Sequence, residues 1–379
     1  MRVEIKPELL RWARKRAGRD RASLRKKFPC LESWERGETK PTFKQLEAFA
    51  KATFVPIGYL FLAEPPAERI PIPDLRIIGG EEIKNPSPDL LDVLYLCQRR
   101  QAWYRDYAKL TGEESRPFVG SLRVEDPVDR AADAMRQTLG FDLEARRACP
   151  TWTEALRQFI DQAENQGILV MVSGVVGSNN RRRLDPQEFR GFALSDDLAP
   201  LVFINGADTK AAQMFTLAHE LAHLWLGKSA LSDVGPASVP SHRIEQWCNR
   251  VAAEFLVPLG VLRDALPHTE PLDEVNNLAR RFKVSTLVIL RRILDARRIS
   301  RDEFQIAYEQ ELEHLRSLPK SKGGDFYLAQ EARASRRFVR ALVVSTLEGQ
   351  TLYRDAFQLL GIKKEQTFTE FGRRLRVTV

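Results

Sequence analysis

The feature that most constrains this chain is a His-Glu-x-x-His motif inside an apolar segment. Residues 215–227 read FTLAHELAHLWLG, with His219 and His223 four positions apart. In a helix, residues at this spacing lie on one face. The two imidazoles can therefore hold one Zn²⁺, while Glu220 can reach a water on that metal. The alternative is a helix turn with ordinary histidines. The apolar flanks favour the zinc site, because polar groups on a buried helix need partners.

The next predicted helix, which ends before Pro258, offers the third ligand that a catalytic zinc takes. Its two candidates are Glu245 and Glu254. Glu245 and Asn249 are four positions apart and share a helix face, so one can bind the metal while the other orients a ligand histidine. We favour Glu245, and we expect Glu254 to lie on the outer face or to support the site. Cys248 is a less favoured ligand.

These segments resemble the ImmA/IrrE metallo-endopeptidases over at least residues 160 to 260. The resemblance is carried by Thr216 to His223, by Glu245 with Cys248-Asn249 and Ala252-Ala253 up to Pro258, and by residues 190–194 and 200–205. It implies a zinc peptidase with His219, His223 and Glu245 as ligands. It also implies a role in regulating gene expression, because relatives cleave transcriptional repressors.

The periodicity upstream of the motif predicts a small sheet. Residues 167–172, 188–194 and 201–205 read as strands. Strands followed by a metal-binding helix suit a zincin-like half-domain, in which an edge strand can pair with an extended substrate backbone. Residues 178–183 (SNNRRR) predict a polar loop, whose arginines form a solvated face or, alternatively, meet an acidic partner. Most other segments have helical spacing, so the predicted fold class is α+β and mostly helical.

The first 64 residues carry most of the excess positive charge. They hold 15 Lys/Arg and 8 Asp/Glu, a balance of 15 − 8 = +7, against +8 for the whole chain. Five short helical segments in this stretch suit a helix-turn-helix domain. The run Trp34 to Glu38, with Pro41-Thr42 and Leu46 to Ala50, resembles XRE-type domains.

One departure from the XRE pattern bears on DNA binding. The segment between the second and third predicted helices, residues 26–31, is shorter than in that family. Two interpretations therefore stay open, DNA binding and the docking of a protein. Specific binding would require a dimer that places two short helices one helical turn apart. The residues that we expect to contact DNA are Arg25, Lys26, Lys27, Ser33 and Arg36.

Composition shifts divide the chain into four expected regions. These are a helix-turn-helix domain (1–64), a Pro-rich linker (65–88), a zincin-like peptidase domain (89–265) and a helical C-terminal region (266–379). No stretch approaches the roughly 20 apolar residues of a membrane span, and no signal peptide precedes the first helix. We therefore expect a cytoplasmic protein without a membrane partner. Its four widely spaced cysteines are expected to be reduced thiols.

The sequence thus predicts a zinc-dependent endopeptidase in which Glu220 moves a proton from water to the leaving amine. From the resemblance, its substrate is a regulatory protein, either a transcriptional repressor or a toxin–antitoxin component. The alternative is a transcriptional regulator or antitoxin-like binding protein that keeps a latent peptidase fold. The intact Glu220 favours the enzyme, because binding alone needs no general base. Duplex DNA and a second copy of the chain are further candidate partners.

Overall fold

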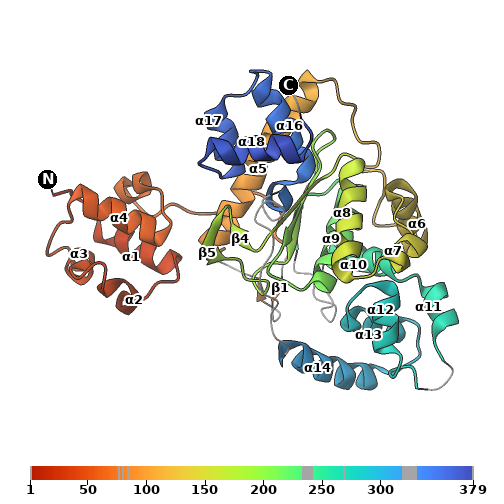
Figure 1. Ribbon diagram of the computed structural model, residues 1–379. Helices are drawn as coiled ribbons and strands as arrows, with labels where there is room; N and C mark the ends of the chain where they lie inside the picture. Colours follow the sequence, from red (N-terminus) through yellow and green to blue (C-terminus); the bar gives the residue numbers. More distant parts are fainter. Residues whose placement is uncertain are drawn as a thin grey trace. The chain divides into compact units, whose positions relative to one another are not determined.

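The computed structural model describes residues 2–75, 77–78, 81–82, 86–232, 242–267, 270–317 and 331–377. The chain forms two compact units. One comprises Met1–Pro71 and Lys84–Asp92, and the other Ile72–Ile83 and Val93–Val379. Helices predominate over a small sheet (Figure 1), so the predicted fold class is confirmed. Among the described residues, no helix is long and apolar enough to cross a membrane.

The N-terminal unit is a small helical domain with its own core. Its elements are α1 (Pro7–Arg16), α2 (Arg21–Arg25), α3 (Leu31–Arg36), α4 (Phe43–Thr53) and the 3-10 helix η1 (Ile57–Phe61). Each matches one of the five short helical segments expected here. Thr42 caps α4 in a capping box with Gln45, as the threonine–glutamine spacing predicts. The rings of Phe28, Trp34 and Phe49 pack together in the core.

A four-stranded sheet organises the second unit. Its strands are β3 (Leu169–Ser173), β6 (Gly191–Leu194), β7 (Leu201–Asn205) and β8 (Ala230–Ser232). They lie in the order β3-β7-β6-β8, with β3 parallel to β7 and the other two pairs antiparallel. The three predicted strands are therefore present, and β8 is an additional strand at one edge. A separate two-stranded ribbon pairs β1 (Ile77–Ile78) with β2 (Glu81–Glu82).

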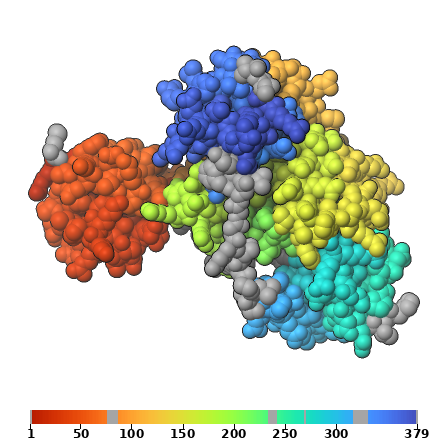
Figure 2. All heavy atoms as spheres, viewed as in Figure 1, coloured from red at the N-terminus to blue at the C-terminus, as the bar shows by residue number. Residues whose placement is uncertain are grey.

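The prediction of a polar loop at residues 178–183 is wrong. This segment contains strand β5 (Asn179–Arg183), which forms an antiparallel hairpin with β4 (Val175–Val176). The side chains of β5 are exposed apart from half-buried Arg182, and the yellow-green atoms of the hairpin lie on the surface in Figure 2. A strand with both faces in water shows no apolar alternation, so its sequence cannot be told from that of a polar loop.

Helices cover both faces of the four-stranded sheet. On one face, α9 packs against β6 and β7, while α8 packs against β3 (Figure 1). Helix α10 packs against α9, and α6 packs against α10. On the other face, Met171 of β3 meets Cys97 and Arg100 of α5. In chain order, the helices from the linker to residue 256 are α5 (Pro88–Leu110), α6 (Val128–Leu139), α7 (Leu143–Ala148), α8 (Trp152–Asn165), α9 (Lys210–Trp225) and α10 (Arg243–Leu256).

The remaining chain is helical, as expected. Its elements are α11 (Leu259–Ala265), α12 (Val275–Phe282), α13 (Thr286–Asp295), α14 (Arg301–Ser317), α16 (Arg336–Leu347), α17 (Tyr353–Leu360) and α18 (Glu365–Arg374). Helices α12 and α13 continue the core that α9 and α10 begin, whereas α16 packs against β3. All four cysteines are unpaired, in agreement with their wide spacing.

Candidate metal centre

The His-Glu-x-x-His motif lies in the second half of the buried helix α9. Thr209 caps the start of this helix by accepting a hydrogen bond from the amide of Ala212. Every residue from Gln213 to Trp225 is buried. The apolar members of this stretch form the core, and the side chains of His219, Glu220 and His223 are each 0% exposed. The sequence therefore places three polar groups in an interior where each needs a partner.

Helix α10 supplies a carboxylate to the two histidines. Glu245 lies in its first turn and is 1% exposed. Its Oε1 lies 2.9 Å from Nε2 of His223, and its Oε2 lies 3.2 Å from Nε2 of His219. The two Nε2 atoms are themselves 3.1 Å apart. The potential ligand atoms of these three residues all lie within 4.8 Å of one another, which makes them a candidate metal-binding group.

The donor set fits a zinc ion. Both rings present the same nitrogen, Nε2, to a common point, and a carboxylate faces them from a second helix. Two imidazoles with one carboxylate is a ligand set of catalytic zinc sites. The geometry therefore brings together the three residues that the motif and the resemblance indicated.

Glu220 lies beside Gly191 of β6, a position that has no room for a side chain. A Cβ atom at Gly191 of β6 would come within 2.6 Å of Cγ2 of Thr216, 2.9 Å of the Phe203 carbonyl oxygen and 3.0 Å of Oε1 of Glu220. The missing side chain lets β6 approach α9 closely. Neither carboxylate oxygen of Glu220 has a hydrogen-bond partner within the described part of the chain. Its carboxylate is thus buried and uncommitted.

Burial and neighbouring charges move the pKa values of the two carboxyls apart. Burial, followed by the negative charge of Glu245, raises the pKa of Glu220 well above its ordinary value. Burial also disfavours ionisation of Glu245, but the two histidines outweigh it and lower the pKa of that carboxyl overall. Two carboxyls in one site with opposite shifts are suited to different tasks, one as an anionic ligand and the other as a proton acceptor.

Ser232 is a member of this site that sequence reasoning missed. Its hydroxyl lies 3.3 Å from Nε2 of His223 and 3.4 Å from Oε1 of Glu245, and its side chain is fully buried. It belongs to β8, a three-residue strand that the sequence pattern did not reveal. The only signal was its position, a few residues after the motif helix.

Three other residues of α10 and its N-terminal cap, namely Asn249, Cys248 and His242, lie near the motif. The Oδ1 atom of Asn249 is buried and forms no hydrogen bond among the described residues, so its expected role in orienting a histidine stays a prediction. Cys248 is buried, and burial raises the pKa of its thiol well above the ordinary value. His242 caps α10, with Nδ1 accepting a hydrogen bond from the amide of Ile244.

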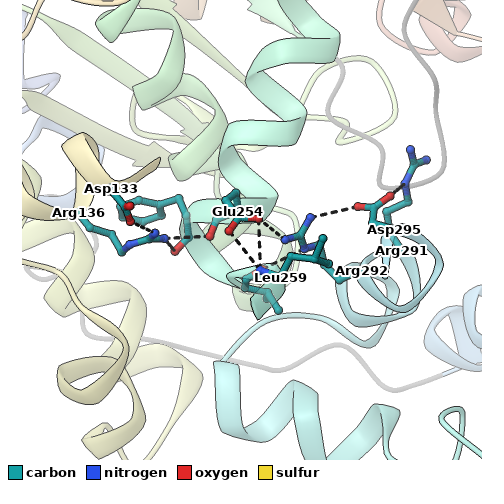
Figure 3. A network of polar contacts seen from close by, with 9 residues as sticks. Asp133, Arg136, Glu254, Leu259, Arg291, Arg292 and Asp295 are labelled. Atoms are coloured by element: carbon teal, nitrogen blue, oxygen red, sulfur yellow. Dashed lines mark hydrogen bonds and ion pairs between the residues drawn. The ribbon is translucent and has the colours of Figure 1, made fainter. Parts of the chain in front are cut away.

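Glu254, the other glutamate considered as a ligand, lies in a separate network of polar contacts (Figure 3). It forms an ion pair with Arg292, and its carboxylate accepts hydrogen bonds from the amide of Leu259 at 3.2 and 3.3 Å. Arg136 donates to the carbonyl oxygen of Glu254 at 2.9 Å. This glutamate therefore ties the end of α10 to α11 and α13, in a network separate from the candidate ligands.

The candidate DNA-contacting residues lie in and beside the α2–α3 pair. Arg25, Lys26 and Lys27 are exposed. Ser33 uses its hydroxyl within the unit, donating to the Cys30 carbonyl oxygen at 2.8 Å and lying 2.7 Å from the hydroxyl of Thr39. Arg36 is exposed and pairs with Glu32 and Glu38. The three cations before α3 are thus exposed, whereas Ser33 and Arg36 have partners within the unit.

Comparison with known families agrees with the site. Residues 163–294 match the IrrE N-terminal-like domain, a domain of peptidase family M78. This segment contains His219, Glu220, His223 and Glu245, and the match supports the resemblance to the ImmA/IrrE family. Residues 334–374 match a domain of unknown function, DUF8813. No curated protein and no solved structure matches the chain.

Proposed function

We propose that the second unit is a zinc-dependent endopeptidase. The observation that carries this proposal is the buried convergence of His219, His223 and Glu245, beside a carboxylate on the next residue of the same helix. His219 and His223 would hold the ion through Nε2, and Glu245 through its carboxylate. A zinc ion bound there supplies a Lewis acid that lowers the pKa of a water molecule and polarises a carbonyl.

Glu220 is the proposed general base. It follows His219 directly, so it shares the helix that presents the ligands, and its carboxylate has no hydrogen-bond partner among the described residues. We propose that it accepts a proton from water and delivers it to the nitrogen of the leaving amine. Its raised pKa suits this task, because a carboxylate of higher pKa is a stronger proton acceptor.

We propose a regulatory protein, a repressor or toxin–antitoxin component, as the substrate. This part of the proposal rests on the resemblance to ImmA/IrrE peptidases. The cleaved bond would lie in an exposed loop of that folded protein, and cleavage would change gene expression. The rival is a binding protein with a latent peptidase fold, and the buried base favours the enzyme over it.

Metal analysis combined with matched variants tests the enzyme. Purified protein should carry about one Zn²⁺ per chain, and the double variant His219→Ala/His223→Ala should carry none. Glu220→Gln should keep the zinc and lose cleavage of proteins that co-purify from the native host, because its amide cannot accept the proton. Full zinc in the double variant would reject the site, whereas cleavage by Glu220→Gln would reject the role of the base.

DNA binding is a second candidate function, assigned to the N-terminal unit. Its specific support is the folded α2–α3 pair with the exposed cations Arg25, Lys26 and Lys27. Contacts to phosphate give affinity without specificity and weaken steeply with salt. We propose weak duplex binding at low salt, with Arg36 contributing. Promoter-specific binding would then need a dimer of the full chain.

A fluorescence anisotropy titration of the full chain tests DNA binding. The chain's own promoter and a scrambled duplex are compared at two salt concentrations, with Lys26→Gln/Lys27→Gln as the variant. Equal affinity for both duplexes, lost together as salt rises, would reject promoter-specific binding. Absence of binding at low salt would reject DNA binding altogether and favour a protein-docking module.

A further inference from the structure

The edge of the sheet beside the metal centre is already occupied by the chain's own linker. Strand β8 is the last strand in the order β3-β7-β6-β8, yet its three residues are each 0% exposed. Leu231, its central residue, donates its N–H to the Pro73 carbonyl oxygen at 3.0 Å. Its own carbonyl oxygen accepts the N–H of Leu75 at 3.0 Å. Asp74 thus forms a parallel bridge with Leu231.

This arrangement uses the main-chain groups that an incoming strand would need. In a three-residue strand, residues alternate in the direction of their N–H and C=O groups. Leu231 directs both groups to the linker, away from its neighbour β6. A polypeptide that added to this edge would have to bond to the same two groups. The linker and such a polypeptide therefore compete.

The edge also lies close to the candidate ligands. Ser232, the residue after Leu231, points its hydroxyl into the site, 3.3 Å from Nε2 of His223. Successive residues of a strand point to opposite sides of the sheet, while the backbone runs along the edge. An extended chain bonded to Leu231 would therefore run next to Ser232, whose hydroxyl contacts the candidate ligands.

We propose that residues 72–75 form a built-in strap on β8, which must leave before an extended segment of the substrate can pair with this edge. The inference rests on the proposed endopeptidase function and concerns its regulation. Two main-chain hydrogen bonds join the strap to β8, and Pro73 has no N–H to add another. Pro73 and Asp74 are exposed, and Ile72 and Leu75 on either side of them are half-buried.

One substitution in the full chain removes a single bond of the strap. Leu75→Pro deletes the N–H that donates to Leu231, and the new proline keeps Asp74 in the extended conformation that the bridge already has. Leu75→Ala is the matched control, because it shortens the same side chain but retains the N–H. Neither variant alters β8 or the proposed ligands.

The rate of hydrogen exchange at the amide of Leu231 reports whether the strap is bound, and it requires no enzymatic activity. This amide should exchange about two- to tenfold faster in Leu75→Pro than in the wild type or Leu75→Ala, since a net main-chain hydrogen bond corresponds to about that factor. A fluorescein-labelled peptide of residues 69–75 should bind Leu75→Pro more tightly than the wild type by a similar factor. Equal exchange and equal peptide affinity in all three proteins would overturn the proposal.

Cleavage of the proteins that co-purify from the native host, measured with the zinc-loaded variants, completes the test. Leu75→Pro should cleave faster than the wild type and Leu75→Ala, and the double variant Leu75→Pro/Glu220→Gln should be inactive. Equal cleavage rates in the three active proteins would overturn the strap. If none of them cleaves while zinc is bound, the endopeptidase proposal fails instead, and the exchange and peptide measurements still decide the strap.

Discussion

Substitution of Glu254 should separate stability from metal binding. Glu245 and Glu254 are nine positions apart on α10, and 9 × 100° places them on opposite sides of the helix. Glu254 faces Arg292, whose side chain is 6% exposed. Removing one member of a buried ion pair costs about 3–5 kcal/mol. Arg292 keeps Asp295 at 3.3 Å and the Val257 carbonyl oxygen at 2.9 Å, so we expect the lower end of this range.

The loss of the cap on Leu259 adds to this cost. The carboxylate of Glu254 accepts the first free amide of α11, a contact whose removal costs about 1 kcal/mol. Glu254→Ala should therefore lower the free energy of unfolding by about 4 kcal/mol, or the melting temperature by about 10 °C. Glu254→Gln should cost less, because its amide oxygen can still accept the Leu259 amide.

Urea titration and metal analysis of the same preparations provide the assay. Glu254→Ala should be less stable and keep about one zinc per chain, whereas Glu245→Ala should lose zinc affinity. A Glu254→Ala protein of unchanged stability would refute the energetic reasoning. Loss of zinc from Glu254→Ala but not from Glu245→Ala would move the proposed ligand to the other face of α10.

Three further predictions concern the interior of the second unit. Gly191→Ala should lower stability by about 1–3 kcal/mol and impair cleavage, because its Cβ would overlap the Phe203 carbonyl oxygen and press on Glu220; normal melting and activity would refute this close approach. Ser232→Ala should weaken zinc affinity about tenfold in a chelator competition, since its hydroxyl contacts Glu245. Burial raises the pKa of Glu164 from 4.5 to about 7. Between these pH values the folded state binds more protons than the unfolded state, so the free energy of unfolding falls by about 3 kcal/mol as pH rises through them. Glu164→Gln should abolish that slope in urea titrations from pH 4.5 to 8, and an unchanged slope would exclude this carboxyl as its source.

The sequence by itself determined the features that depend on local period. The four-residue spacing of His219 and His223 within an apolar run was enough to predict a buried helix with both imidazoles on one face, because an α-helix returns to the same face after one turn. The apolar strands β3, β6 and β7 were predictable for the same reason. The exposed strand β5 was not, since its polar side chains carry no signal of period two.

Only the tertiary structure decided which distant groups meet. Glu245 and Glu254 lie on one helix with similar flanks, and the choice between them depended on which face of α10 packs against α9. The place of Ser232 and the pairing of Leu231 with the linker required contacts between segments far apart in the chain, which no local pattern encodes. Burial then set the opposite pKa shifts of Glu220 and Glu245, because desolvation and neighbouring charges act through space and not along the sequence.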